Sequence, residues 1–194
     1  KNSALSFFIM DEGIDSGEIL LQKSFVNNNK PIKFLLKKLN NAAYAGMLEL
    51  CQLLRINPLK EGVIQNKNNE NIWRKRNLHD LILDPRFEKS TFVNIVNSFS
   101  SPYDGAVLIT AINEIHRIVS VKEQKKSERE FNWENREYGY VFDLKDYEIF
   151  LKIGETVLIL KCKKTLKSSQ LKRGNKIYPP SYYLDKTNYL SSLL

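Results

Sequence analysis

The sequence predicts an α/β segment followed by a small antiparallel β-barrel, and three observations lead to this fold class. Two apolar runs, residues 4–9 and 18–26, precede a long helical stripe. Five short runs rich in β-branched and aromatic residues fill the second half of the chain. A polar and then basic stretch separates the two parts. The expected organisation is an α/β sheet edge at 1–59, a linker at 60–88, a barrel at 89–177 and a tail at 178–194.

The first part begins with two expected strands around a turn. "ALSFFI" is a compact apolar run typical of a buried strand, and "EILLQKSFV" is a second one. Between them, Gly13 and Gly17 permit backbone angles that other residues avoid. Asp15 is therefore expected on a constrained loop at the end of a strand.

A long helix should follow this hairpin. Apolar residues recur every three or four positions from 32 to 54, which is the spacing of an amphipathic helix. Asn29 and Pro31 suit its start, and Asn57 before Pro58 suits its end.

The second part should open with a short helix at 89–99, capped by Ser90 or Thr91, and continue as strands. Signals such as "LKDY" and "IGET" mark turns between them. A five-stranded, oligonucleotide-fold-like barrel is the expected type. The predicted strands cover 106–112, 116–123, 138–144, 147–153 and 156–164.

Composition narrows the class of partner. The net charge of +8 attracts anions, so a nucleotide, a polyanion or a nucleic acid are all compatible partners.

No apolar run approaches the roughly 20 residues that span a bilayer, and we expect no membrane association. Cys51 and Cys162 lie far apart and are expected to be buried thiols, which suits the cytoplasm. Neither zinc-ligand spacing nor a glycine-rich phosphate loop occurs, so no metal site is predicted.

The turn-rich stretch carries the first resemblance to a known family. "FFIMDEGIDSGEILLQKSF" resembles the signature of formyltransferases that use 10-formyltetrahydrofolate, in which a strand leads into D-E-G-I-D-[ST]-G-x-I-x-x-Q. The matching positions are Asp11, Glu12, Gly13, Ile14, Asp15, Ser16, Gly17, Ile19 and Gln22.

A second stretch is similar to the join between catalytic core and barrel in the same family. There, an R-[ST]-x-x-D segment precedes a helix that ends in P-Y-P-G-A. Asn77 stands where Ser or Thr is usual, and Asp104 replaces a proline. Arg76 and Tyr103 flank the joining helix, so packing at the junction is their expected role, with substrate contact as the alternative. The matching positions are Arg76, Asp80, Pro102, Tyr103, Gly105 and Ala106.

The resemblance implies a role for the first loop. In the family, the aspartate at the position of Asp15 lies beside a histidine and shuttles protons while a substrate amine attacks the formyl carbon of the folate. Asp15 is thus the expected catalytic residue. Glu12, Gly13 and Ile14 are expected to contact the donor, 10-formyltetrahydrofolate.

One departure from the family pattern is large. Family members carry N-x-H and S-L-L-P motifs, within a further α/β half, before the aspartate loop, and neither motif occurs here. His79 and His116 follow the catalytic part and are not convincing substitutes. The chain is therefore expected to correspond to the C-terminal portion of such an enzyme, to need the missing N-terminal half as a partner, and to be inactive alone.

Three functions follow from these features. "DEGIDSG" with "WRKR" and "PYDGA" resembles the sugar-nucleotide N-formyltransferases more closely than the transfer-RNA enzymes. The acceptor of the former is a nucleotide-linked amino sugar used for surface polysaccharide. The resemblance also allows for a homo-oligomer. The first alternative is a methionyl-tRNA formyltransferase. The second is a non-enzymatic basic barrel that binds nucleic acid through phosphates and stacked bases.

Overall fold

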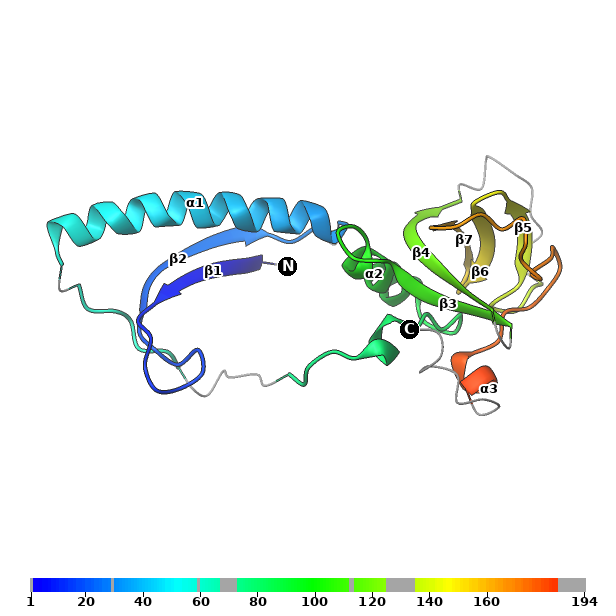
Figure 1. The fold of residues 1–194 in the computed structure, drawn as a ribbon, viewed down its shortest axis with the longest axis horizontal. Helices are drawn as coiled ribbons and strands as arrows, with labels where there is room; N and C mark the ends of the chain where they lie inside the picture. Colours follow the sequence, from blue (N-terminus) through cyan, green and yellow to red (C-terminus); the bar gives the residue numbers. More distant parts are fainter. Residues whose placement is uncertain are drawn as a thin grey trace. The chain divides into compact units, whose positions relative to one another are not determined.

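A computed structural model describes residues 2–28, 30–58, 60–66, 73–111, 114–124 and 135–184 (Figure 1). The chain divides into two compact units, Lys1–Lys75 and Arg76–Leu194. The division falls inside the stretch expected to be a linker, and the predicted domain boundaries stay predictions. The expected cap Asn29 and residues 185–194 of the expected tail lie outside the described residues.

The first unit is a hairpin with one long helix. Strands β1 (Asn2–Phe8) and β2 (Ile19–Val26) pair antiparallel, with a register shift between Phe7 and Phe8. Helix α1 (Ile32–Ile56) lies along this hairpin, as Figure 1 shows. It starts directly after Pro31 and ends where the backbone N–H of Asn57 donates to Leu53, 2.9 Å away. The predicted strands and helix are confirmed.

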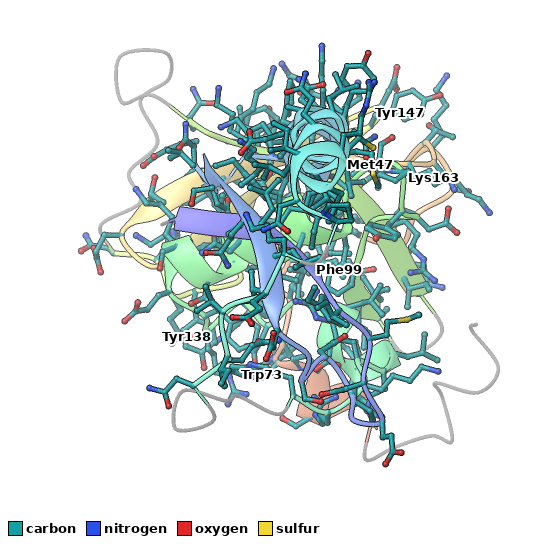
Figure 2. All side chains as sticks on the ribbon, turned by 90° about the vertical axis from the view of Figure 1, so that its left-hand side faces the viewer. Met47, Trp73, Phe99, Tyr138, Tyr147 and Lys163 are labelled. Carbon is teal, nitrogen blue, oxygen red and sulfur yellow. The ribbon has the colours of Figure 1, made fainter. Side chains whose placement is uncertain are left out.

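A glycine sets the contact between helix and hairpin. Gly46 is the buried residue of α1. A Cβ at this position would lie 2.4 Å from Cε2 of Phe7, so any side chain would push the helix off β1. Tyr44, Met47 and Leu48 of the same helix are at least half exposed, and Figure 2 shows Met47 on α1.

The first unit buries little of its own surface. Among its described residues, Gly17 and Gly46 alone are buried. Two strands and one helix enclose only a small hydrophobic core, because a small unit buries a smaller fraction of its surface than a large one. Several apolar side chains of this unit therefore remain exposed, among them Phe34, Tyr44, Met47 and Leu48.

The second unit is built on a curled antiparallel sheet (Figure 1). Its strand order is β3-β4-β7-β6-β5, and no described residues of β3 pair with β5. The sheet is thus a half-barrel, and closure into a full barrel is not confirmed. The strands are β3 (Ala106–Ala111), β4 (Glu114–Glu123), β5 (Val141–Lys145), β6 (Glu148–Ile153) and β7 (Thr156–Cys162).

Short helices accompany this sheet: α2 (Lys89–Phe99), α3 (Pro180–Leu184) and a 3-10 turn at Leu78–Leu81. The expected caps of α2, Ser90 and Thr91, were wrong. The helix covers the predicted residues and follows Glu88, whose carbonyl accepts from the N–H of Phe92 at 3.0 Å. This backbone bond starts the helix without a side-chain cap.

The main core lies between α2 and one face of the sheet. Phe92 and Val96 of α2 and the alternate residues Ile149, Leu151 and Ile153 of β6 belong to one buried cluster. Alternation along a strand places every second side chain on the same face, which explains this set. Phe150, which lies between Ile149 and Leu151, belongs to a separate cluster with Phe142 and Val157.

Extended segments protect both edges of the sheet. Beyond β3, the N–H of Leu83 donates to Val107 at 2.8 Å, and Ile82 bridges to the same residue. Beyond β5, Tyr140 bridges to Lys176. Covered edges cannot pair with other chains, so the half-barrel is protected against edge-to-edge association.

The two thiols differ in environment. Cys162 is buried, and burial raises its pKa to about 12. Cys51 is exposed on α1, so the expectation that both thiols are buried was wrong. Neither forms a disulfide. No helix among the described residues has the length and apolar character needed to cross a bilayer.

Candidate functional site

The loop between β1 and β2 carries the residues expected to be functional. It closes where the N–H of Ile9 donates to the carbonyl of Glu18 at 3.0 Å. Gly17 is buried directly against this closure: a Cβ there would lie 1.6 Å from the carbonyl oxygen of Ile9. Only glycine fits this position, so Gly17 fixes the base of the loop.

Asp11 organises the loop from inside. Its Oδ1 accepts from the backbone N–H of Gly13 at 3.0 Å and from the hydroxyl of Ser16 at 2.7 Å. An aspartate that bonds the backbone two residues ahead is a common way to stabilise a turn. Two positions of the sequence motif, Asp11 and Ser16, thus shape the loop.

The predicted site residues are all exposed at the loop surface. Glu12, Gly13 and Asp15 are exposed, and Ile14 is 93% exposed. Asp15 has φ +53°, a left-handed conformation that aspartate tolerates better than most residues. The loop therefore presents the carboxylates of Glu12 and Asp15 beside an open stretch of backbone and a protruding apolar side chain.

A segment that follows α1 in the sequence contacts this loop and holds it in place. Val63 and Ile19 exchange two backbone hydrogen bonds of 2.8 and 2.9 Å. The side-chain amide of Gln65 donates to the carbonyls of Asp15, at 2.8 Å, and Gly17, at 2.7 Å. Sequence analysis missed Gln65, because it lies 50 residues from Asp15 in a polar stretch without periodicity.

The junction motif has a structural explanation. Asn77 caps the 3-10 turn: its side chain accepts from the N–H of His79 at 3.0 Å, and its own N–H donates to Asp80 at 2.8 Å. This reciprocal pair is a capping box, which Asn completes as well as the usual Ser or Thr. Arg76, the residue before, lies over the ring of Phe99 at 5.7 Å.

The loop after α2 carries the rest of this motif. Tyr103 is 55% exposed, and its backbone N–H donates to Ser100 at 3.1 Å. Asp104, where the family has proline, pairs with Lys163 at 2.9 Å, and this bond lowers the pKa of Asp104. Gly105 has φ +97° and leaves no room for a Cβ against Ile118. Arg76 and Tyr103 thus both lie at the C-terminal end of α2.

The two histidines belong to the second unit. His79 is exposed, and His116 is 9% exposed. His116 Nε2 lies 3.7 Å from Glu114 and 3.4 Å from the Ser169 hydroxyl. Burial lowers the pKa of His116 despite the opposing charge of Glu114. Burial on its own would raise the pKa of Glu114. The net shift is nevertheless downward, because Glu114 accepts hydrogen bonds from Thr110, Gln170 and Ser169 and lies near the charge of His116.

This cluster predicts a pH-dependent stability. Because the folded state lowers the pKa of His116 below its ordinary 6.5, the unfolded chain takes up a proton that the folded chain resists. The free energy of unfolding should therefore fall as pH drops from 7 through 6.5, by at most about 1.4 kcal/mol per pH unit. Urea unfolding followed by circular dichroism between pH 7 and 5.5 measures this slope.

Two histidine variants test the assignment. His116→Gln should flatten the slope, whereas the exposed His79→Gln should preserve it. A slope that survives in His116→Gln would mean that another group causes it.

Aromatic side chains on the sheet bear on the nucleic-acid alternative. Phe142 and Phe150 are buried, whereas Tyr138 is 39% and Tyr147 47% exposed. The exposed ring of Tyr138 already has the ammonium of Lys176 over it at 5.1 Å. The sheet therefore shows no open row of aromatic rings among its described residues. Nor do these residues contain a group of three or more side chains suited to hold a metal ion.

Comparisons with known proteins add the fold relationship. No protein-family model and no curated protein matches the chain. Among solved structures, HypX from Aquifex aeolicus in complex with tetrahydrofolic acid matches with a TM-score of 0.63 and 14% identity, over 82% of this chain and 26% of HypX. WlaRD, a sugar 3N-formyltransferase solved with dTDP and 5-N-formyl-tetrahydrofolate, matches with a TM-score of 0.55 and 20% identity. The chain shares the N-formyltransferase fold.

A further structure agrees with this assignment of the fold. The N-formyltransferase from Helicobacter canadensis, in complex with folinic acid and dTDP-3-aminofucose, matches with a TM-score of 0.50 and 20% identity. The chain corresponds to 55% of WlaRD and 56% of the Helicobacter enzyme, while 84% and 83% of its own length is covered. It therefore spans about half of these N-formyltransferases.

Proposed function

We propose that the chain is the C-terminal portion of an enzyme that transfers a formyl group from 10-formyltetrahydrofolate to the amino group of a nucleotide-linked amino sugar. The observation that carries the proposal is the Asp15 loop. Its carboxylate is exposed on a backbone fixed by Gly17 and Gln65, in a chain that shares the N-formyltransferase fold.

The loop fits a flat folate donor. Glu12, Gly13 and Ile14 form an exposed edge in which Gly13 carries no side chain, and Ile14 offers an uncovered apolar surface. A planar ring can approach such a backbone closely. We assign these three residues to donor binding, where the donor supplies a formyl group bound to nitrogen.

Asp15 would transfer protons during the reaction. In the transfer, the acceptor amine forms a bond to the formyl carbon and loses one proton, while the nitrogen that releases the formyl group gains one. A carboxylate fixed next to both nitrogens can accept the first proton and return it. We assign this role to Asp15, with an imidazole partner from outside the chain.

Features of the first unit support the need for a further α/β half as a partner. Residues 1–75 contain no histidine, and their described part buries only two glycines. A second α/β half would cover the apolar faces of β1, β2 and α1 and supply the histidine. We call this chain together with that half the completed enzyme.

The substrate class rests on the solved relatives. WlaRD is a sugar 3N-formyltransferase, and the Helicobacter enzyme was solved with dTDP-3-aminofucose. A net charge of +8 favours an anionic nucleotide sugar. We propose a role in polysaccharide biosynthesis and a cytoplasmic location, which suits two free thiols. The half-barrel would be an oligonucleotide-fold-like domain, with Arg76 and Tyr103 as junction residues.

An activity assay with two samples tests this function. The 194-residue chain alone should release no tetrahydrofolate from 10-formyltetrahydrofolate in the presence of amino-sugar nucleotides, because Asp15 lacks its histidine partner. The completed enzyme should release it with each formyl transfer. Transfer by the chain alone, at the rate of the completed enzyme, would contradict the proposal.

A further inference from the structure

We propose that Gln65 is a positioning residue for Asp15, which it holds in its left-handed conformation from a segment beyond α1. The inference rests on the proposed function of Asp15 for its catalytic part. Its structural part rests only on the contacts of residues 9–19 with residues 62–65, all within the first unit.

The side-chain amide of Gln65 has both of its hydrogens committed. Nε2 lies 2.8 Å from the carbonyl of Asp15 and 2.7 Å from the carbonyl of Gly17. Two carbonyl acceptors require the nitrogen side of the amide, so the orientation of the side chain is settled by its partners. The two bonds fix the direction of the Asp15–Ser16 and Gly17–Glu18 peptide groups.

Asp15 needs such support because its backbone is strained. A non-glycine residue at φ +53° is less stable there than in the ordinary regions. The loop surface offers no burial that would compensate, since Asp15 and its three predecessors are exposed. Hydrogen bonds to its carbonyl and to that of Gly17 are therefore a direct means of holding the carboxylate in one direction.

The segment that carries Gln65 is itself anchored to β2. Val63 pairs with Ile19 through two backbone bonds of 2.8 and 2.9 Å. The N–H of Gly62 donates to the carboxylate of Glu18 at 3.1 Å, and a Cβ on Gly62 would lie 2.5 Å from that of Glu18. Residues 62–65 thus act as an extra short strand that delivers Gln65 to the loop.

Amide hydrogen exchange on the 194-residue chain tests the clamp without any need for activity. Gln65→Met keeps the length of the side chain and removes the donor, and it should make the hydrogen-bonded amides of Gly13, Ile19 and Val63 exchange about tenfold faster. Gln65→Lys, which can donate to both carbonyls, should restore protection. Gln52→Met, on the exposed side of α1, is the matched control and should change nothing in the loop.

A double-mutant cycle in the completed enzyme tests the positioning role. Gln65→Met should lower kcat about 10- to 100-fold with KM changed less than about threefold, and Gln65→Lys should recover most of it. In an Asp15→Asn background the same Gln65→Met change should have almost no further effect on kcat.

The outcomes separate the two claims. Unchanged exchange in Gln65→Met would overturn the clamp. Faster exchange with an undiminished kcat would overturn the positioning role and leave the function intact. Equal losses of kcat with and without the Asp15 carboxylate would show a role independent of Asp15, and would also overturn it. Normal turnover in Asp15→Asn alone would overturn the proposed role of Asp15, and the positioning role with it.

Discussion

Asp15→Asn is expected to lower kcat of the completed enzyme by about 10²–10⁴-fold, the usual contribution of a positioned acid or base. Asparagine has nearly the same shape and tolerates the left-handed conformation at φ +53°, so the loop should keep its structure. The KM for the formyl donor should change little, because the donor is assigned to Glu12, Gly13 and Ile14. Steady-state kinetics with 10-formyltetrahydrofolate measure both constants.

A second carboxamide variant controls for charge. Glu61 is exposed in the same unit, and Glu61→Gln should retain full activity. Near-normal turnover in Asp15→Asn, with unaltered donor binding, would remove Asp15 from the mechanism.

Gly17→Ala should have the largest effect on the loop itself. The new methyl group would lie 1.6 Å from the carbonyl oxygen of Ile9 and 2.8 Å from its carbonyl carbon, so the backbone must move. We expect a loss of about 3 kcal/mol in the stability of the first unit, at the upper end of overpacking costs. Activity of the completed enzyme should be lost with it. Thermal unfolding and amide exchange of β1 and β2 measure the change.

A substitution at a second glycine serves as a control, because it causes backbone strain without a steric clash. Gly154 has φ +54°, but no atom lies within 4 Å of the position of a Cβ. Gly154→Ala should therefore cost only the left-handed penalty, about 1 kcal/mol. Equal effects of the two substitutions would mean that the loop does not close as described.

Local sequence patterns predicted the elements of the first unit well. The hairpin and α1 follow from the spacing of apolar residues, and Asn57 with Pro58 marked the helix end. Such signals are short-range and need no knowledge of tertiary contacts. The range of α2 was predicted correctly, but its cap was not, because the helix begins after Glu88 without a Ser or Thr side-chain cap.

Long-range contacts account for the rest. The bonds from Gln65 to Asp15 and Gly17 join residues about fifty positions apart, and no periodic pattern marks them. Closure of a barrel likewise depends on whether the first and last strands meet, which alternation within each strand does not determine. The exposure of Cys51 depends on which side of α1 is covered.

The structure also sorts the motif residues by role. Asp11, Ser16 and Gly17 hold the loop through hydrogen bonds and close approach, whereas Asp15 and Ile14 face outward. Asn77, which departs from the family pattern, forms the same kind of cap with Asp80 that Ser or Thr would form. A departure from a motif can thus preserve its physical role.

Formyl transfer by the completed enzyme to two kinds of acceptor, compared side by side, tests the central claim most directly. One acceptor is a set of dTDP- and UDP-linked amino sugars, and the other is methionyl-tRNA, each supplied with 10-formyltetrahydrofolate. We expect formylation of at least one amino-sugar nucleotide and none of methionyl-tRNA. Efficient formylation of methionyl-tRNA alone would contradict the substrate assignment, and transfer to neither acceptor would contradict the proposed enzyme activity.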